Sequence, residues 1–249
     1  MGKQAIDRAM ILAAGLGTRL RPITDTIPKP LVEVSGKALI DYGFDALRTA
    51  GIKRAVVNVH YRADQLRAHL KTVAGMQIDV SDETAQLLDS GGGVVNALPF
   101  LGSAPFVILN ADTFWLEAPS AVQSNLQRMI EAFDERSMDI LMLTVSPDRA
   151  TGHDGGGDFT MDADGRLTRF DGKGDGMIYA GALIVHPRIF DHSPKGPFSL
   201  NACFDRALVL DRMRGLALAG HWLTVGTPQA IGEAERAIAR CEAGVHQPV

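Results

Sequence analysis

The amino-acid sequence predicts an α/β protein with a Rossmann-like, open, mostly parallel sheet that carries helices on both faces. Apolar stretches of strand length alternate with amphipathic stretches of helix length over residues 9–145. Strands buried on both faces of a parallel sheet form such uninterrupted apolar runs, and strand–helix alternation builds right-handed βαβ units. Because ligands bind these sheets at the carboxyl ends of the strands, we expect the functional site at that edge.

Each element of this first half follows from its local pattern. The run AMILAA at 9–14 ends at a glycine, as expected of a buried strand. A helix is predicted at 39–51, where apolar residues recur at helical spacing and Gly51 closes the pattern. The other predicted elements are strands at 54–60, 76–83, 105–112 and 138–145, and helices at 62–73, 92–101 and 118–133.

The pattern changes near residue 147, where a polar, glycine-rich stretch begins. A hairpin is predicted at 158–172 around Asp164-Gly165, because Asp-Gly between alternating apolar residues is a hairpin signal. A strand is expected at 176–187, and helices at 199–213 and 228–242. We therefore expect a small β-rich subregion that packs on the first half within a single domain over residues 1–249.

The composition is that of an ordinary globular chain, with 46% hydrophobic and 22% charged residues among 249. A net charge of −4 argues against a nucleic-acid-binding protein, which would carry a basic face. The first apolar run is too short and too interrupted by charge for a signal peptide, and no run reaches the length of a membrane span. The isolated Cys203 and Cys241 fit no metal or redox spacing. We expect a cytoplasmic monomer or homodimer that binds small molecules, with neither nucleic acid nor membrane as a partner.

The stretch AGLGTRLRPITDTIPKP at 14–30 carries the main functional signal. Glycines after a buried strand let backbone N–H groups approach phosphate oxygens, so this loop is a candidate anion site. A dinucleotide fingerprint would need a third glycine where Leu20 stands, and the P-loop pattern is absent. Taken alone, the two glycines are equally compatible with a simple tight turn.

Three cations strengthen the anion-site hypothesis. Arg19 and Arg21 follow the loop closely, and Lys29 stands between two prolines that restrict its backbone. Three cations that converge on a backbone anion site can neutralise a triphosphate.

The segment LAAGLGTRLRPITDTIPKPLVEVSGKALIDY at 12–42 resembles the signature of the sugar-1-phosphate nucleotidyltransferases, or nucleotide-sugar pyrophosphorylases. The resemblance continues more loosely to VGT near residue 226, so it covers most of the chain. It implies the nucleotide-diphospho-sugar transferase fold, with a nucleotide-binding half at about 1–146 and a sugar-binding half at about 147–249. It also implies attack by a sugar 1-phosphate on the α-phosphorus of an NTP, with Mg²⁺ as cofactor and pyrophosphate as leaving group.

The resemblance assigns roles within the loop. Arg19 and Lys29 would be the catalytic residues: Arg19 would hold the phosphates to be expelled, and Lys29 would bridge the attacking phosphate and the α-phosphate. Preorganised cations relieve the repulsion between two approaching anions. Arg21 would support the loop. The nucleotide-binding residues expected here are Ala13, Ala14, Gly15, Gly17 and Thr18.

At the expected metal site, the sequence differs from the family pattern at one residue. Asp112, in LNADTFW, would hold Mg²⁺ against the α- and β-phosphates. A second family carboxylate belongs to a Trp-x-Asp-x-Gly-Thr element, where this chain has Thr224. Either the hydroxyl of Thr224 replaces the carboxylate, or another acid such as Asp158 compensates, or the enzyme is impaired. We expect that activity is retained, because the phosphate-handling residues are otherwise complete.

The segment DETAQLLDSGGG resembles the family element that binds the base. Glu83 would accept the N3–H of uracil, although it would equally accept the N1–H and N2–H of guanine. Gly91 and Gly92 would allow close approach of the nucleotide. Uridine is therefore favoured over guanosine, and a solvated loop carboxylate is the structural alternative for Glu83.

The expected sugar contacts are Asn110, Asp158, Asp171 and Gly181, with Lys173 beside them. Asp and Lys in glycine-rich loops are often only turn residues, and Tyr179, Trp222 and the histidines are expected to be structural. The chain has no Glu-Lys-Pro element after the hairpin, and in this it is most similar to family members that use N-acetylmuramic acid 1-phosphate and UTP in peptidoglycan recycling. The alternatives are another pair, such as mannose 1-phosphate with GTP, or a regulatory protein that binds nucleotide sugars without turnover.

Overall fold

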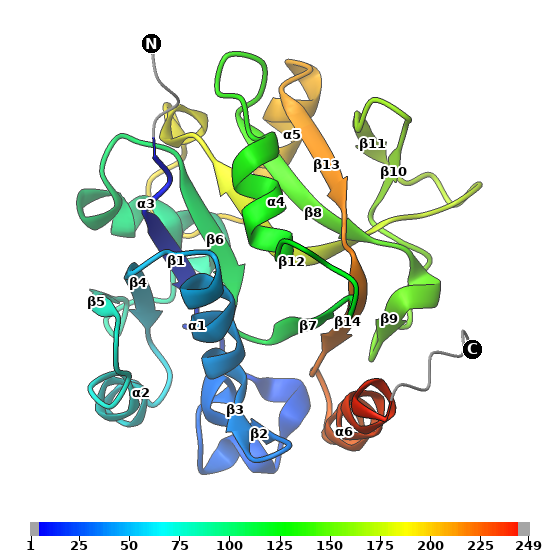
Figure 1. Ribbon diagram of the computed structural model, residues 1–249. Coiled ribbons are helices and arrows are strands. Elements are labelled where there is room, and N and C mark those ends of the chain that lie inside the picture. Colours follow the sequence, from blue (N-terminus) through cyan, green and yellow to red (C-terminus); the bar gives the residue numbers. More distant parts are fainter. Residues whose placement is uncertain (1–4, 244–249) are drawn as a thin grey trace.

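The computed structural model describes residues 5–243, and its centre is a seven-stranded sheet (Figure 1). The strand order is β13-β8-β12-β6-β1-β4-β5, in which β12 runs antiparallel to both neighbours and the other pairs are parallel. Its strands are β1 (Arg8–Leu12), β4 (Arg54–Val59), β5 (Gln77–Asp82), β6 (Phe106–Asn110), β8 (Ile140–Val145), β12 (Ile178–Val185) and β13 (Met213–Ala217). The predicted open, mostly parallel sheet is confirmed.

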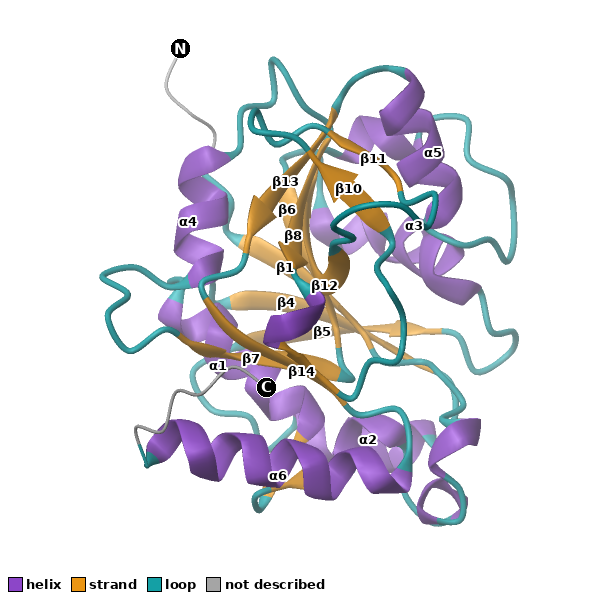
Figure 2. Cartoon of the chain, turned by 90° about the vertical axis from the view of Figure 1, so that its right-hand side faces the viewer, coloured by secondary structure: helices purple, strands orange, loops and turns teal. Residues whose placement is uncertain are grey.

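Helices cover both faces of this sheet, as predicted. Successive residues of a strand point to opposite faces, so Ile11 joins the apolar core under α1, α2 and α4, whereas Met10 joins the core under α3 and α5. Figure 2 shows α4 and α5 on opposite sides of the sheet. The helices are α1 (Leu39–Thr49), α2 (Ala63–Leu70), α3 (Asp89–Leu101), α4 (Asn125–Ala132), α5 (Asn201–Val209) and α6 (Pro228–Glu242).

A second, three-stranded sheet lies below the central one and supports α6 (Figure 2). It joins β7 (Thr113–Glu117), which follows β6 almost directly, to β14 (Gly220–Thr224) and the short β9 (Ala150–Thr151). Apolar residues of β7, β14 and α6 form a third core cluster. The remaining strands form two small hairpins, β2 (Glu33–Val34) with β3 (Lys37–Ala38) and the predicted β10 (Phe159–Met161) with β11 (Leu167–Arg169).

Two predicted helices are wrong in part. The segment predicted as a helix at 118–133 becomes helical only at Asn125, after the Ser124–Gln127 capping box, and strand β7 stands before it. The helix predicted at 199–213 ends at Val209, because β13 begins four residues later. The prediction also lacked β2, β3, β9 and β14. Strands β7 and β13 each pair with a segment far away in the sequence, β7 with β14 and β13 with β8. No local pattern could reveal those pairings.

Both ends of the chain lie outside the part that the structure describes. The expectation about a signal peptide concerns in part residues 1–4, which lie outside the described range, as do residues 244–249. Between residues 5 and 243, none of the helices combines the length and the apolar character that crossing a bilayer requires.

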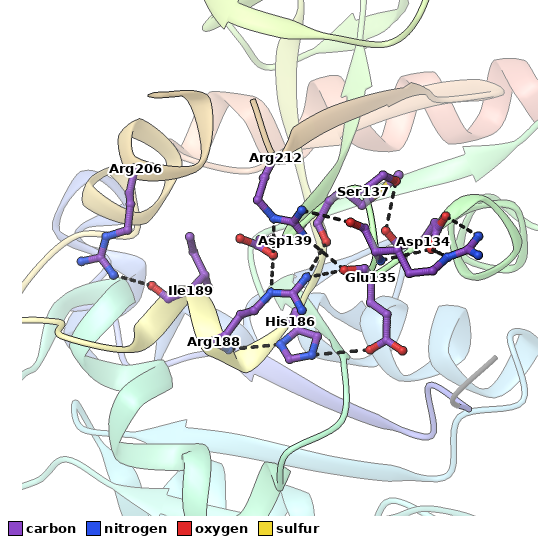
Figure 3. Close-up of polar contacts among 11 residues, drawn as sticks. Asp134, Glu135, Ser137, Asp139, His186, Arg188, Ile189, Arg206 and Arg212 are labelled. Carbon is purple, nitrogen blue, oxygen red and sulfur yellow. Dashed lines mark hydrogen bonds and ion pairs between the residues drawn. The ribbon is translucent and has the colours of Figure 1, made fainter. Parts of the chain in front are cut away.

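A charged cluster ties the sheet together at the amino ends of β8 and β13 (Figure 3). Asp139 is 4% exposed, accepts a hydrogen bond from Nε of Arg188 at 2.5 Å and forms an ion pair with Nε of Arg212 at 2.9 Å. Both guanidinium groups also donate to the backbone oxygen of Glu135. One carboxylate therefore joins the turn after β12, the start of β13 and the loop before β8.

Replacing Asp139 with alanine should lower the free energy of unfolding by about 3 kcal/mol, because it leaves two partly buried arginines without their counter-ion. Urea denaturation followed by circular dichroism measures this change. The matched control is Asp205→Ala, which breaks an exposed pair with Arg169 and should cost less than about 1 kcal/mol. Equal effects of the two substitutions would contradict the special role of Asp139.

Candidate active site

The glycine loop after β1 has a left-handed turn at Gly17, with φ of +64°. A Cβ atom at this position would lie 2.9 Å from Cγ2 of Thr24 and 3.0 Å from Cβ of Lys29. The buried Thr24 hydroxyl also donates to the backbone oxygen of Gly17 at 2.8 Å. The chain then continues through three short 3₁₀ turns at 18–20, 23–25 and 29–31, and no long helix follows the loop.

Lys29 and Asp112 form an ion pair at the carboxyl end of the sheet. Nζ of Lys29 lies 2.5 Å from Oδ2 of Asp112, and the Lys29 side chain is 12% exposed. The backbone around Asp112 is fixed on both sides, because Ala111 donates to the Leu12 oxygen at 3.1 Å and the Asp112 oxygen accepts from Val225 N–H at 3.1 Å. The two residues expected at the α-phosphate are thus brought into contact with each other.

The two arginines of the loop differ in their surroundings. Arg21 forms an exposed pair with Asp25 at 3.2 Å, consistent with a supporting role. The Arg19 guanidinium lies against Gly226, where a Cβ atom would be 3.3 Å from its Nη1. Among residues 5–243, Arg19 has no hydrogen-bond or ion-pair partner. The loop and the VGT turn, which are some two hundred residues apart in the numbering, therefore meet around an unpaired positive charge.

A cavity of about 540 Å³ opens at this edge of the sheet. Such a volume accommodates a nucleotide-sized ligand. Of the residues predicted from the sequence, Ala13, Ala14, Gly15, Lys29, Glu83, Asn110 and Asp112 line it. The other lining residues are Leu12, Pro30, Asn58, Leu87, Asp89, Ser90, Ala111 and Pro197.

Glu83 is held in this cavity by a chain of hydrogen bonds. Its side chain is 2% exposed, Oε1 accepts from Nδ2 of Asn58 at 2.7 Å, and Oε2 accepts from Leu88 N–H at 3.1 Å. Oδ1 of Asn58 in turn accepts from the N–H of Ala13 at 2.6 Å. Glu83 is therefore no solvated loop carboxylate, and Asn58 connects it to the glycine loop.

Asn58 is a site residue that the sequence analysis missed. The available signal was a polar amide inside the otherwise apolar strand RAVVNV. Gly93 was also missed: a Cβ atom there would lie 2.7 Å from Oε1 of Glu83 and 2.9 Å from Nδ2 of Asn58. The Glu83–Asn58 contact thus requires a glycine on α3.

Gly91 and Gly92, near the start of α3, pack closely against residues 196–198. Both N–H groups donate to the backbone oxygen of Phe198, at 2.8 and 3.1 Å. A Cβ atom at Gly91 would lie 2.4 Å from the Phe198 ring, and one at Gly92 would lie 2.6 Å from the oxygen of Gly196. Neither glycine is among the residues that line the cavity. Their expected contact with the nucleotide stays a prediction.

The predicted sugar contacts lie at different depths. Asn110 lines the cavity. Gly181, on β12, lies beside Asn110, and its φ of +76° and the nearby Oγ1 of Thr113 exclude a Cβ atom at this position. Oδ2 of Asp158 accepts from Tyr179 N–H at 2.8 Å. Asp171 lies in an exposed turn in which Oδ1 accepts from Lys173 N–H at 3.0 Å, so its role toward a sugar stays a prediction.

Trp222 and two of the histidines have contacts typical of structural residues. Trp222 is 3% exposed and donates from Nε1 to the Ala180 oxygen at 2.9 Å, and His153 contacts its ring edge-on. Nε2 of His221 lies 2.8 Å from Oγ1 of Thr151, and burial lowers the pKa of this histidine.

The donors available for a metal are few. Thr224 pairs with Thr113 in the β14–β7 ladder, one residue from Asp112, and its backbone oxygen leaves no room for a Cβ atom at Gly152. In the described part of the chain, no three Asp, Glu, His or Cys side chains gather as a metal site. Mg²⁺ typically takes one or two protein carboxylates and completes its shell with phosphates and water. Asp112 therefore fits Mg²⁺ that arrives with a nucleotide, and not a dedicated protein cage.

Comparisons with known proteins agree with this geometry. The profile of the family described as nucleotidyl transferase matches residues 8–240. The chain is 42% identical to the N-acetylmuramate alpha-1-phosphate uridylyltransferase of Caulobacter vibrioides over 95% of this chain and 98% of that protein. It is 35% identical to the protein of the same name in Neisseria meningitidis serogroup B, over 92% and 96%. The crystal structure of HddC from Yersinia pseudotuberculosis complexed with GMP-PN has the same fold, with a TM-score of 0.73 at 23% identity over 94% of this chain and 100% of that chain.

Replacing Asn58 with alanine should destabilise the protein by about 2–4 kcal/mol, because the Ala13 N–H and one Glu83 oxygen each lose a buried partner. Thermal and urea unfolding measure the loss. The control is Gln65→Ala, which removes an exposed amide that donates to the Thr26 oxygen at 3.1 Å and should change stability by less than about 1 kcal/mol. A neutral Asn58→Ala would show that the chain of hydrogen bonds does not hold the site.

Proposed function

Since the chain belongs to the nucleotidyl transferase family of sugar-1-phosphate nucleotidyltransferases, we propose that it transfers UMP from UTP to N-acetylmuramic acid 1-phosphate. An oxygen of the sugar 1-phosphate attacks the α-phosphorus, the bond from that phosphorus to the bridging oxygen breaks, and pyrophosphate leaves. The observation that supports this substrate pair most is the similarity, over nearly the whole chain, to two relatives that carry this name.

Lys29 and Asp112 support the chemistry of the transfer. Bound Mg²⁺ would neutralise charge on the α- and β-phosphates, and Asp112 is the carboxylate that would hold it. Lys29 Nζ is 2.5 Å from that carboxylate, which keeps the ammonium beside the phosphorus to be attacked. Its charge would stabilise the negative charge that builds up as the two phosphates approach.

Arg19 supports the binding of the phosphates that leave. Its guanidinium is exposed at the glycine loop and has no partner among the described residues, so it is free to donate to phosphate oxygens. The neighbouring Gly15–Gly17 turn would add backbone N–H donors for the same phosphates. Ala13 and Ala14 line the cavity on the way to Glu83.

Glu83 supports recognition of uracil. A carboxylate is an acceptor without a donor, and each of its oxygens keeps capacity for another hydrogen bond beyond the one it accepts from protein. Glu83 can accept the N3–H of uracil, and guanine, with its N1–H and N2–H, is the competing base. We infer that Asn110, which lines the cavity, contacts the sugar together with Gly181 and Asp158, which lie outside the cavity lining.

Thr224 is the observation that favours a second candidate, a regulatory protein that binds nucleotide sugars without turnover. The hydroxyl stands where the family pattern has a carboxylate, so the site has one negative charge less for a metal. An intact set of phosphate-handling groups favours turnover. The measurement below distinguishes the two candidates.

The proposed function is tested by measuring pyrophosphate release with Mg²⁺ or with EDTA. UTP, GTP, CTP, ATP and dTTP are each combined with a panel of sugar 1-phosphates that includes N-acetylmuramic acid 1-phosphate and mannose 1-phosphate. We expect Mg²⁺-dependent turnover that is highest for UTP with N-acetylmuramic acid 1-phosphate. Turnover of another pair would replace the substrates and keep the class. Nucleotide binding without release from any pair would support the regulatory protein instead.

Replacing Lys29 with alanine should lower kcat by about 100-fold, since one preorganised donor to the transition state is lost. Steady-state kinetics with both substrates measure the effect. The control is Lys37→Ala, which removes an exposed lysine paired with Asp45 and should leave kcat unchanged. A rise in KM at constant kcat would show that Lys29 only binds the ground state.

A further inference from the structure

The hydroxyl of Tyr179 is buried and has no hydrogen-bond partner in the described part of the chain. Buried tyrosine hydroxyls almost always have a partner, so an orphaned one needs an explanation such as a water or a ligand. Tyr179 is the second residue of β12 and its ring packs edge-on against Phe204, with centroids 5.8 Å apart. The ring is therefore held in place, and the hydroxyl is presented at a fixed position.

Tyr179 itself does not line the cavity, but residues that do line it lie close by. β12 pairs antiparallel with β6, with Ala182 opposite Leu109, and Gly181, two residues from Tyr179, packs against the cavity residue Asn110. Tyr179 and Leu12 pack against the same core cluster, on the face covered by α3 and α5, and Leu12 lines the cavity. Asn110 lies between them on β6 and lines the cavity too.

Two carboxylates surround the phenol without accepting its proton in a hydrogen bond. Asp158 accepts the backbone N–H of Tyr179 at 2.8 Å through Oδ2, and Asp112 follows β6 on the neighbouring strand. Burial raises the pKa of Tyr179 far above its ordinary value, and the charges of Asp112 and Asp158 raise it further. The hydroxyl is thus a permanent donor at physiological pH and lacks an acceptor.

We propose that Tyr179 is a sugar-binding residue, whose hydroxyl donates to an oxygen of the sugar 1-phosphate while the neighbouring Asp158 accepts from one of the sugar's hydroxyl groups. A sugar offers donors and acceptors close together, as this pair of side chains requires. A bare triphosphate offers only acceptors and would be repelled by the Asp158 carboxylate. The inference rests on the proposed function, because it names the part of that site which holds the acceptor substrate.

The test is Tyr179→Phe, which removes only the orphaned hydroxyl. We expect the KM for N-acetylmuramic acid 1-phosphate, at saturating UTP, to rise about tenfold, the loss of one hydrogen bond to a ligand. The KM for UTP should not change. The Tm of the free protein should equal or exceed that of the wild type, because no existing hydrogen bond is lost.

Two further variants sharpen the test. Tyr42→Phe is the matched control: its hydroxyl donates to the Val34 oxygen at 2.8 Å, so we expect a lower Tm with both KM values unchanged. Asp158→Asn retains an acceptor for the Tyr179 N–H but loses the charge. It should raise the KM for the sugar 1-phosphate and leave that for UTP unchanged.

The outcomes separate the inference from the function on which it rests. Wild-type turnover with an unaltered KM for the sugar 1-phosphate in Tyr179→Phe would overturn the inference alone. A parallel rise in both KM values would do the same, since it would indicate a distorted site. If the wild type turns over no sugar 1-phosphate with any NTP, the proposed function fails and the inference fails with it.

Discussion

The ion pair between Lys29 and Asp112 is the constraint on which the arrangement of the site depends. An ammonium that is only 12% exposed requires a counter-ion, because an unpaired charge at that depth is strongly destabilising. The pair draws the turn-rich segment 18–31 against the end of β6, across 83 positions of sequence. Gly17 allows this approach, since a side chain there would meet both Thr24 and Lys29.

The ion pairs of the loop also determine which of its three cations is without a carboxylate partner in the free protein. Lys29 and Arg21 each have a carboxylate partner, whereas Arg19 has none among residues 5–243. The attraction of an incoming triphosphate would therefore depend first on Arg19, and Lys29 would act only after Asp112 has taken another cation. Under the proposed function, the Asp112 carboxylate would hold Lys29 near the α-phosphorus and would balance its positive charge until a substrate binds. This order follows from the contacts and the proposed function together.

Local periodicity was sufficient to predict the strand–helix alternation and the edge of the sheet at which the site lies, because both depend on short stretches of sequence. It failed for β7 and β13, whose strand character depends on partners far along the chain. The site shows the same limit. Lys29 and Asp112 belong to local motifs that single them out as candidates, whereas Asn58 matters only through its contacts with Ala13 and Glu83, which the fold brings to it. Tyr179 was expected to be structural, and its orphaned hydroxyl is visible only in three dimensions.

Thr224 has a consequence for the charge balance of the free site. With a threonine there, the single negative charge of Asp112 is balanced by Lys29. A carboxylate at position 224, whose ladder partner Thr113 directly follows Asp112, would add a second negative charge close to the first. Such a site would favour a resident cation. Under the proposed function, the site with Thr224 would instead favour a cation that enters with the nucleotide, because phosphate oxygens would supply the remaining ligands.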